Sequence, residues 1–361
     1  MTDFLLAIGT TKGLILGRSN DRISWTLSEP QFFMNGVYAV AIDVRGRSPR
    51  LLASATSEHW GPSVFHSDDL GVTWAEPDEG SIAFPVDTDV SLGRVWQLAP
   101  SLSEPGVMWA GSEPQGLFRS VDGGEHFSFV RTLWDHPHRP DWGAGFGGAA
   151  IHTVLAHPTD PGRVVVAMST GGVYRSDDAG ETWSASNSGV KAYFLPDPWP
   201  EFGQCVHKIA RDPGEADRLY LQNHHGVYRS EDDGRTWTSI AAGLPTDFGF
   251  AMVTHPRRSN VAFTFPVQAD AARVPPERAC RVYRTDDGGD SWTPLSTGLP
   301  QDDYYGIVLR DAMCTDDAEP AGVYFGTRNG DVYASPDEGE RWSLIGTHLP
   351  DVLCVRAAQI A

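Results

Sequence analysis

The sequence is poor in cysteine and has no long apolar run. Four cysteines occur among 361 residues, with no Cys-x-x-Cys pair, so we expect reduced thiols and no disulfide framework. No stretch of eighteen apolar residues is present, which predicts no membrane-spanning helix. The N-terminus, Met1-Thr2-Asp3, has no basic segment of the kind that opens a signal peptide. Together these features predict a cytoplasmic protein.

Basic residues are also few. Lys and Arg number 28 against 47 Asp and Glu, which gives a formal net charge of −19 at pH 7. Nucleic-acid binding needs clustered Lys and Arg to neutralise phosphates, so we expect neither nucleic acid nor an anionic membrane as a partner. A small-molecule ligand fits this composition, and the net charge favours one that is neutral or cationic. The sequence does not indicate an oligomeric state.

What the sequence has in abundance is one repeated phrase, Ser-x-Asp-x-Gly-x-Thr-Trp, and its variants. Successive copies begin 48, 53, 56, 54, 55 and 50 residues apart, and the first copy is one residue short and lacks the Gly. The seven copies begin at Ser19, Ser67, Ser120, Ser176, Ser230, Thr285 and Ser335. A period near fifty residues indicates a repeat architecture.

Each copy lies within a set of short β-branched and aromatic runs separated by Gly, Asn, Asp and Pro. Around the fifth copy, residues 207–210, 219–221, 226–229 and 236–240 have the pattern of four strands, as in a propeller blade. The Asp and Ser of the phrase can bond backbone N–H groups in the turn between the third and fourth strands. We therefore interpret the repeated carboxylates as turn formers, with the Trp filling the gap between neighbouring sheets.

The two ends of the chain complement each other. Residues 4–10 and 13–16 match the second and third strands of a blade, and residues 352–356 match a first strand with nothing after it. Pairing them would cover both sheet edges. The predicted fold is an all-β, seven-bladed β-propeller of four-stranded antiparallel blades. It is closed by pairing of the N- and C-terminal strands, and residues 1–361 form a single domain.

The repeated phrase resembles the BNR or Asp-box repeat of sialidases, sortilin-like receptors, xyloglucan hydrolases and the plant photosystem II stability factor. Over nearly the whole chain, the likeness is to bacterial single propellers labelled sialidase-like or photosystem II stability factor-like. The resemblance implies the blade structure and says little about activity. True sialidase activity is not expected, because the chain has no Arg-Ile-Pro and seven repeats where sialidases have six blades.

Propeller topology separates the loops into two faces. The loop between the second and third strands and the connection to the next blade share one face, and the box turns lie on the other. Two long insertions, 133–150 and 185–205, also belong to the first face, and long loops are often functional. Aligned first strands place one residue per blade at the mouth of the central channel: Tyr38, Trp96, His152, His207, Phe250, Tyr305 and Leu353.

Histidines gather on this first face. Imidazole clusters suit Zn, Mn, Fe or Ni, so one divalent transition metal is predicted. Its ligands would be His152, His207 and His224, with His225 as the alternative to the last. The competing interpretation is that these histidines hydrogen-bond in a polar pocket or pack between blades. No nucleotide cofactor is expected, because no Gly-rich phosphate loop is present.

The leading hypothesis is an enzyme, a hydrolase or lyase, that binds a small polar molecule at the channel mouth. Metal-assisted chemistry or His/Glu acid–base catalysis would drive hydrolysis, elimination or isomerisation. The predicted catalytic residues are Glu113, His152 and His207. The predicted substrate-binding residues are Lys12, His59, Trp60, Trp96, Gln115, Asn223, His225, Tyr305 and Arg328. The alternative is a non-catalytic protein-interaction or assembly-factor propeller.

Overall fold

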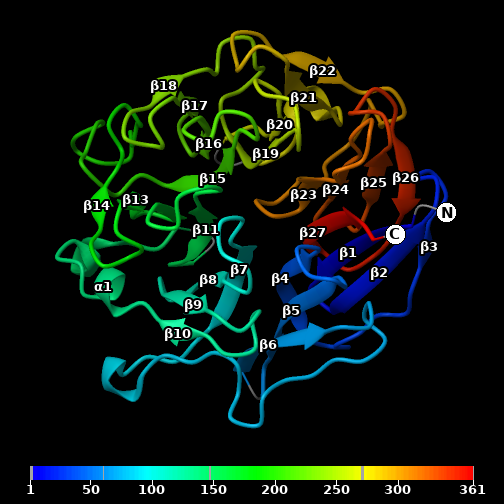
Figure 1. The fold of residues 1–361 in the computed structure, drawn as a ribbon. Coiled ribbons are helices and arrows are strands. Elements are labelled where there is room, and N and C mark those ends of the chain that lie inside the picture. Colours follow the sequence, from blue (N-terminus) through cyan, green and yellow to red (C-terminus); the bar gives the residue numbers. More distant parts are fainter. Residues whose placement is uncertain (1–2, 60, 146–147, 270–271, 361) are drawn as a thin grey trace.

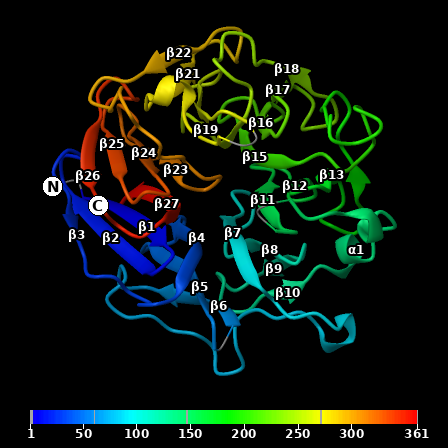
Figure 2. The ribbon, with the colours of Figure 1, turned by 180° about the vertical axis from the view of Figure 1, so that it is seen from behind.

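Seven antiparallel sheets form a ring around a central channel (Figure 1). The computed structural model describes residues 3–59, 61–145, 148–269 and 272–360. The view from behind shows the same arrangement, with one strand of each sheet nearest the centre (Figure 2). The predicted seven-bladed β-propeller is therefore confirmed. Within the described residues, no helix is long and apolar enough to cross a membrane.

The first four blades follow the chain from its N-terminus. From the inner to the outer strand, blade 1 contains β27 (Val352–Gln359), β1 (Phe4–Thr10), β2 (Gly13–Ser19) and β3 (Thr26–Leu27). Blade 2 contains β4 (Gly36–Asp43), β5 (Arg50–Ser57) and β6 (Gly61–Ser67). Blade 3 contains β7 (Arg94–Pro100), β8 (Met108–Glu113), β9 (Leu117–Ser120) and β10 (Ser128–Phe129). Blade 4 contains β11 (Ile151–Ala156), β12 (Val164–Met168), β13 (Gly172–Ser176) and β14 (Ser184–Ala185).

The last three blades have the same inner-to-outer order. Blade 5 contains β15 (Val206–Arg211), β16 (Leu219–Asn223), β17 (Val227–Ser230) and β18 (Thr238–Ser239). Blade 6 contains β19 (Gly249–Thr254), β20 (Ala262–Pro266), β21 (Val282–Thr285) and β22 (Thr293–Leu295). Blade 7 contains β23 (Met313–Thr315), β24 (Val323–Gly326), β25 (Val332–Ser335) and β26 (Ser343–Gly346). Four short helical turns lie between strands: η1 (Val86–Thr88), α1 (Arg131–Trp134), η2 (Arg139–Asp141) and η3 (Pro276–Arg278).

Pairing of the two ends of the chain closes the ring. Strand β27 pairs with β1 from Phe4 opposite Gln359 to Thr10 opposite Val352, so the predicted closure is confirmed. Blade 2 has three full strands, and a single bridge between His66 and Ala75 stands where its fourth strand would be. Closure covers the edge of β1 that would otherwise be open to pairing with another chain.

The repeated phrase forms the turn after the third strand of each blade. In the second copy, Gly71 N–H donates to Ser67 Oγ over 2.8 Å, and Thr73 donates to Asp69 through both its backbone N–H, at 2.8 Å, and its hydroxyl, at 2.6 Å. Hydrogen bonds from Thr73 and Ser67 lower the pKa of Asp69 to about 2. The carboxylate thus makes its hydrogen bonds within the turn, as the sequence predicts.

The Trp of the phrase joins neighbouring blades. Trp237 Nε1 donates to the backbone oxygen of Ser186, which follows the outer strand of blade 4, over 2.9 Å. Trp292 Nε1 makes the equivalent bond to Ile240, which follows the outer strand of blade 5, over 2.8 Å. Each indole therefore packs between two sheets with its N–H satisfied.

Candidate functional site

The inner strands of six blades share a β-bulge near their beginning. In blade 4, Ile151 pairs with Met168 and Thr153 with Ala167, which leaves His152 as the extra residue. The residues at or within the bulge are Tyr38, Trp96, His152, His207, Phe250 and Leu353. A bulge bends the strand and re-aims a side chain. The positions that the sequence aligns at the channel mouth are thus the positions where the backbone departs from the regular ladder.

Blade 7 is different, and there the sequence alignment is wrong. Its inner strand β23 begins at Met313, so Tyr305 does not lie on that strand. Tyr305 is 56% exposed, and its hydroxyl oxygen accepts a hydrogen bond from Arg278 at 3.2 Å. The chain segment before β23 instead places Arg310 and Asp311 against the channel, and both are buried.

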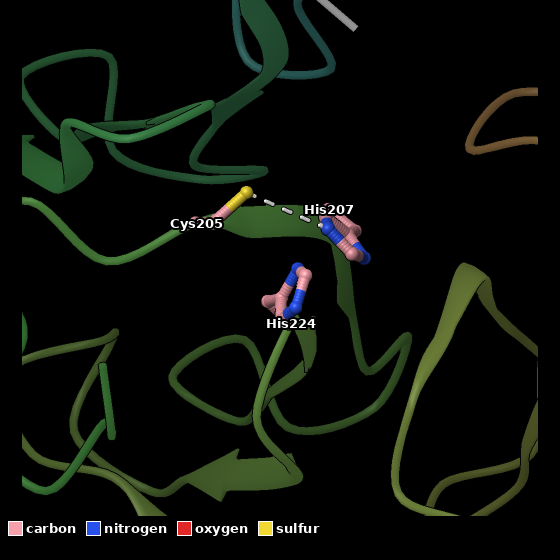
Figure 3. Close-up of side chains that lie close together, drawn as sticks. All are labelled: Cys205, His207 and His224. Atoms are coloured by element: carbon pink, nitrogen blue, oxygen red, sulfur yellow. Dashed lines mark hydrogen bonds between the residues drawn. The ribbon is translucent and has the colours of Figure 1, made fainter. Parts of the chain in front are cut away.

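Three possible metal ligands converge at the channel mouth of blade 5 (Figure 3). They are Cys205, just before β15, His207 on β15, and His224 in the loop after β16. One ligand atom from each lies within 4.8 Å of the others, and Cys205 Sγ is 3.6 Å from His207 Nε2. The predicted pair His207 and His224 is therefore brought together, but the third member of the group is Cys205 and not His152.

The surroundings of His207 prepare one nitrogen for a ligand. Its Nδ1 lies 2.5 Å from the carbonyl oxygen of Gly249, so Nδ1–H donates and Nε2 keeps its lone pair toward Cys205. Burial, then the charge of Arg310, lowers the pKa of His207 well below its usual value, which keeps the ring neutral. A neutral imidazole fixed by a carbonyl is the usual form of a metal-binding histidine.

Cys205 is a buried thiol that holds its proton more tightly than a free cysteine when no metal is bound. It is 7% exposed, and burial raises its pKa, against the opposing charges of Arg310 and Arg273. A coordinated cation removes the thiol proton and converts it to a thiolate ligand. The donor set of one sulfur and two imidazoles suits zinc and other borderline-soft divalent metals.

His152 lies near this group without joining it. Its ring is 1% exposed, Nδ1 is 3.3 Å from Thr153 Oγ1, and Nε2 has no hydrogen-bond partner among the described residues. Burial first, then the charges of Arg310 and Lys208, lowers its pKa well below the usual value. His152 is therefore a neutral, buried imidazole with one nitrogen free to accept or donate.

Arg310 occupies the centre of the channel. Its guanidinium carbon lies 5.7 Å from the ring centroid of Trp96 in blade 3 and 5.6 Å from that of Phe250 in blade 6. These blades are not neighbours in the ring (Figure 1), so the side chain reaches across the channel. Phe250 in turn stacks on His207, with ring centroids 4.9 Å apart. The sequence interpretation did not single out Arg310.

Glu113 ends strand β8 of blade 3, and only blade 4 lies between it and the Cys205 group. Its Oε2 accepts hydrogen bonds from Trp96 Nε1 at 3.0 Å and lies 3.1 Å from Arg94 Nε. The Arg94 guanidinium also covers the rings of Tyr38 and Trp96. Glu113 is therefore already paired and is absent from the group of possible metal ligands. Its predicted role as a general base stays a prediction.

Three predicted substrate-binding residues instead anchor the two insertions. Gln115 Nε2 donates to the carbonyl of Gly143 at 3.1 Å. Asn223 Nδ2 donates to the carbonyl of Lys191 at 2.7 Å, and His225 Nδ1 accepts from Tyr193 N–H at 3.3 Å. These bonds hold the loops that form one wall of the site.

Between the insertions lies an open pocket of about 490 Å³. Its wall includes Gly203, two residues before Cys205, and Thr170, whose backbone hydrogen-bonds the Cys205 thiol. The aromatic side chains Tyr193, Phe194 and Trp199 of the second insertion are each about half exposed beside it. Cys205, His207 and His224 do not line the pocket themselves, but Phe194 in its wall packs on His224, with ring centroids 5.9 Å apart.

The remaining predicted binding residues lie farther out on the loops. Lys12 and His59 are exposed. The guanidinium of Arg328 is engaged by Asp351, with an Nη2–Oδ2 distance of 2.7 Å. Trp60 falls outside the described residues.

Two assignments came only from the structure: Cys205 as a possible metal ligand, and Arg310. Cys205 precedes β15 by one residue, and the bulge at His207 turns the ring back toward it. Arg310 precedes β23 by three residues. An arginine just before an inner strand, in a chain with few basic residues, is the signal that could have identified it.

Fold and turns together define this chain as an Asp-box β-propeller with seven blades. The BNR/Asp-box repeat profile matches residues 174–185, which contain the fourth copy of the phrase. The chain is 25% identical over 308 residues to a xyloglucanase of Paenibacillus sp, covering 76% of this chain and 28% of that protein. It is 22% identical over 336 residues to a xyloglucanase of Hypocrea jecorina, covering 92% and 34%. The chain thus spans about a third of the length of these relatives.

Solved structures show the same fold. An ancestral GH74 enzyme superposes with a TM-score of 0.56 at 16% identity, covering 85% of this chain and 38% of that one. YCF48 from Cyanidioschyzon merolae superposes with a TM-score of 0.55 at 14% identity, covering 85% and 84%. YCF48 bound to D1 peptide gives a TM-score of 0.52 at 14% identity, covering 85% and 81%.

Proposed function

We propose that this protein is a metal-dependent hydrolase with its active site at the channel mouth of blade 5. The observation that carries the proposal is the convergence of Cys205, His207 and His224, whose ligand atoms lie within 4.8 Å of one another. The identity to xyloglucanases supports hydrolysis as the reaction class. A divalent ion bound there would supply Lewis acidity.

The protein's own residues would divide the remaining tasks. Gly249 fixes the tautomer of His207 through its carbonyl. His152, neutral and with Nε2 unpartnered among the described residues, is suited to take or give a proton. The pocket of about 490 Å³ beside Cys205 would admit a small polar substrate. Phe248 and Phe250, both packed on His207, exclude water from its far side.

Metal analysis of untagged protein tests the proposal. We expect about one equivalent of zinc or a similar divalent metal after dialysis. Losing a residue that hydrogen-bonds to a metal ligand reduces metal affinity roughly 10–100-fold. Cys205→Ser removes a ligand itself and should reduce the affinity by more. Cys280→Ser is the matched control, because Cys280 is also buried but lies outside the group. Turnover of a p-nitrophenyl ester and glycoside panel should disappear with Cys205→Ser or EDTA and survive Cys280→Ser.

Two results would contradict it: no stoichiometric metal in wild type, or turnover that survives both EDTA and Cys205→Ser. The second candidate function is a protein-interaction propeller. It is supported by the exposed side chains of Tyr193, Phe194 and Trp199. Lys191 Nζ lies 5.2 Å from the ring centroid of Tyr193 and 5.6 Å from that of Trp199. This alternative predicts no bound metal and a partner that is lost when Trp199 is replaced by Ser.

A further inference from the structure

The guanidinium of Arg310 is a buried cation without a hydrogen-bonded anion. Arg310 is 8% exposed, forms no hydrogen bond or ion pair within the described part of the chain, and its Nε is fully buried and unpartnered. The charge of the next residue, Asp311, acts on Arg310, but Asp311 Oδ1 bonds Lys208 at 2.8 Å and Arg356, and Asp311 Oδ2 makes no hydrogen bond to Arg310. A buried charge is costly unless it is paired and hydrogen-bonded, so the free N–H groups of Arg310 call for a hydrogen-bonding anion that the described residues do not supply.

The groups around Arg310 describe that partner. The flat rings of Trp96 and Phe250 flank the guanidinium, and the nearby imidazoles of His152 and His207 are held neutral. Neither ring accepts a conventional hydrogen bond, so the N–H groups of Arg310 remain available for a bidentate bond to a carboxylate. A second guanidinium, that of Arg273, lies 5.9 Å from the ring centroid of Phe250. Because flat rings flank Arg310, a planar carboxylate fits better than a tetrahedral phosphate.

We propose that Arg310 binds the carboxylate of a small organic molecule at the centre of the channel mouth. The anion site stands on the position of Arg310 alone, whereas calling its ligand the substrate rests on the function proposed above. The proposed metal site and the proposed anion site are compatible in charge. A divalent ion with the Cys205 thiolate would leave a net charge of +1 beside Arg310, and an anionic ligand balances part of this excess.

Cys205 offers a reporter for the site, because its Sγ lies 3.6 Å from His207 Nε2 and the His207 ring stacks on Phe250, whose centroid is 5.6 Å from the Arg310 guanidinium carbon. Iodoacetate and iodoacetamide alkylate thiols by the same reaction: the sulfur displaces iodide from a methylene carbon, and the thiol proton passes to the buffer. Iodoacetate carries a carboxylate where iodoacetamide carries a neutral amide. We expect the ratio of iodoacetate to iodoacetamide labelling rates at Cys205 to be about tenfold higher in the folded protein than in the urea-unfolded chain.

The assay is run at pH 8.5 in EDTA, with labelled cysteines identified by mass spectrometry. EDTA separates this test from the metal proposal, whose failure would leave the labelling ratio unchanged. Arg310→Met should reduce the preference to that of the unfolded chain, and Arg310→Lys should keep part of it. Because Arg310→Met removes an unpaired buried charge, its melting temperature should equal or exceed that of wild type. A purely structural role would lower it.

Formate as a competitor, at constant ionic strength, should slow iodoacetate labelling of wild type and leave iodoacetamide labelling unchanged. This arm also decides the matter if Arg310→Met fails to fold. The proposal is overturned if wild type shows no preference for iodoacetate, if Arg310→Met retains the preference, or if neither reagent reaches Cys205 in the folded protein. Better protection by inorganic phosphate than by formate would overturn the assignment of a carboxylate.

Discussion

Histidines in this protein differ in charge because they differ in burial. His152 is enclosed, and burial followed by the charge of Arg310 lowers its pKa well below the usual value. His126, on the box turn of blade 3, is bonded to Asp122 over 2.8 Å, and that bond raises its pKa. One residue type is therefore kept neutral by burial at the channel and holds its proton more tightly on the box turn.

The two histidines should change the pH dependence of folding in opposite directions. A group with a lowered folded pKa contributes stability above its unfolded pKa, near 6.5, and this stability is lost as pH falls. His152→Asn should therefore flatten the loss between pH 6.5 and 5.5, by up to about 1.4 kcal/mol per pH unit. His126→Asn should steepen that loss, because a raised pKa contributes stability below the unfolded pKa that is lost as pH rises.

Urea denaturation in EDTA at pH 7.5, 6.5 and 5.5 measures both slopes. Equal slopes for wild type and His152→Asn would show that His152 does not stay neutral in the folded protein.

At the scale of single elements, the inner strands explain what the sequence could and could not predict. The spacing of the repeated phrase aligns the blades well enough to place His152 and His207 at matching positions, and both lie at bulges. In blade 7 the inner strand is only three residues long and begins late, so the same frame selected Tyr305 in place of Arg310. The local sequence pattern of a strand does not reveal where the strand starts when pairing with neighbouring strands decides that point.

The metal group shows a second limit. Cys205 and His207 are close in sequence, but their side chains meet only because the bulge re-aims the ring and Gly249 of the next blade fixes it. That contact crosses between blades, and no pattern within one repeat encodes it. His224 was predictable because propeller topology brings the loop after the second strand to the same face.

The second insertion depends on a few polar anchors. Asn223, fully buried at the end of β16, donates to the carbonyl of Lys191, and Ala192 N–H donates to Pro198 within the same loop. Most of the loop's other residues are partly or fully exposed, so its order relies on these bonds. The pocket wall therefore has lower local stability than the blades.

Asn223→Ala should free the loop at Lys191, where trypsin cleaves. Losing a buried hydrogen bond of about 1–1.5 kcal/mol predicts roughly five- to tenfold faster cleavage after Lys191, with a small loss in global stability. Asn329→Ala is the matched control, because Asn329 is exposed on the corresponding loop of blade 7. Peptide mapping over time gives the rate, and an unchanged rate at Lys191 would show that Asn223 does not anchor the loop.

For the molecule as a whole, charge is distributed unevenly. The chain carries a net charge of −19, and the box aspartates lie on the face away from the pocket. At the channel, by contrast, Arg310, Lys208 and Arg356 are all at least partly buried around the single carboxylate of Asp311. Net charge alone favoured a neutral or cationic ligand, whereas the local field at the channel favours an anion.

Asp311 also links blades that are remote in sequence. Its carboxylate pairs with Lys208 Nζ of blade 5 at 2.8 Å and with Arg356 of blade 1, across the position where the ring closes. Burial alone would raise the pKa of Asp311, but the charges of Lys208 and Arg356 outweigh it and lower the pKa. The pairing therefore stabilises the ring above pH 4, and this stability is lost as pH falls through the lowered folded pKa.

Asp311→Asn should destabilise the closed ring by about 3–5 kcal/mol, because it leaves two buried cations without their anion. Asp302→Asn, at an exposed position, controls for the loss of one negative charge and should change stability by less than about 0.5 kcal/mol. Urea denaturation at pH 7 measures both. If the two variants unfold at the same urea concentration, the blades are held by their apolar contacts and the box tryptophans alone. If Asp311→Asn unfolds earlier and combination with Lys208→Met restores part of the loss, the ion cluster contributes to closing the ring.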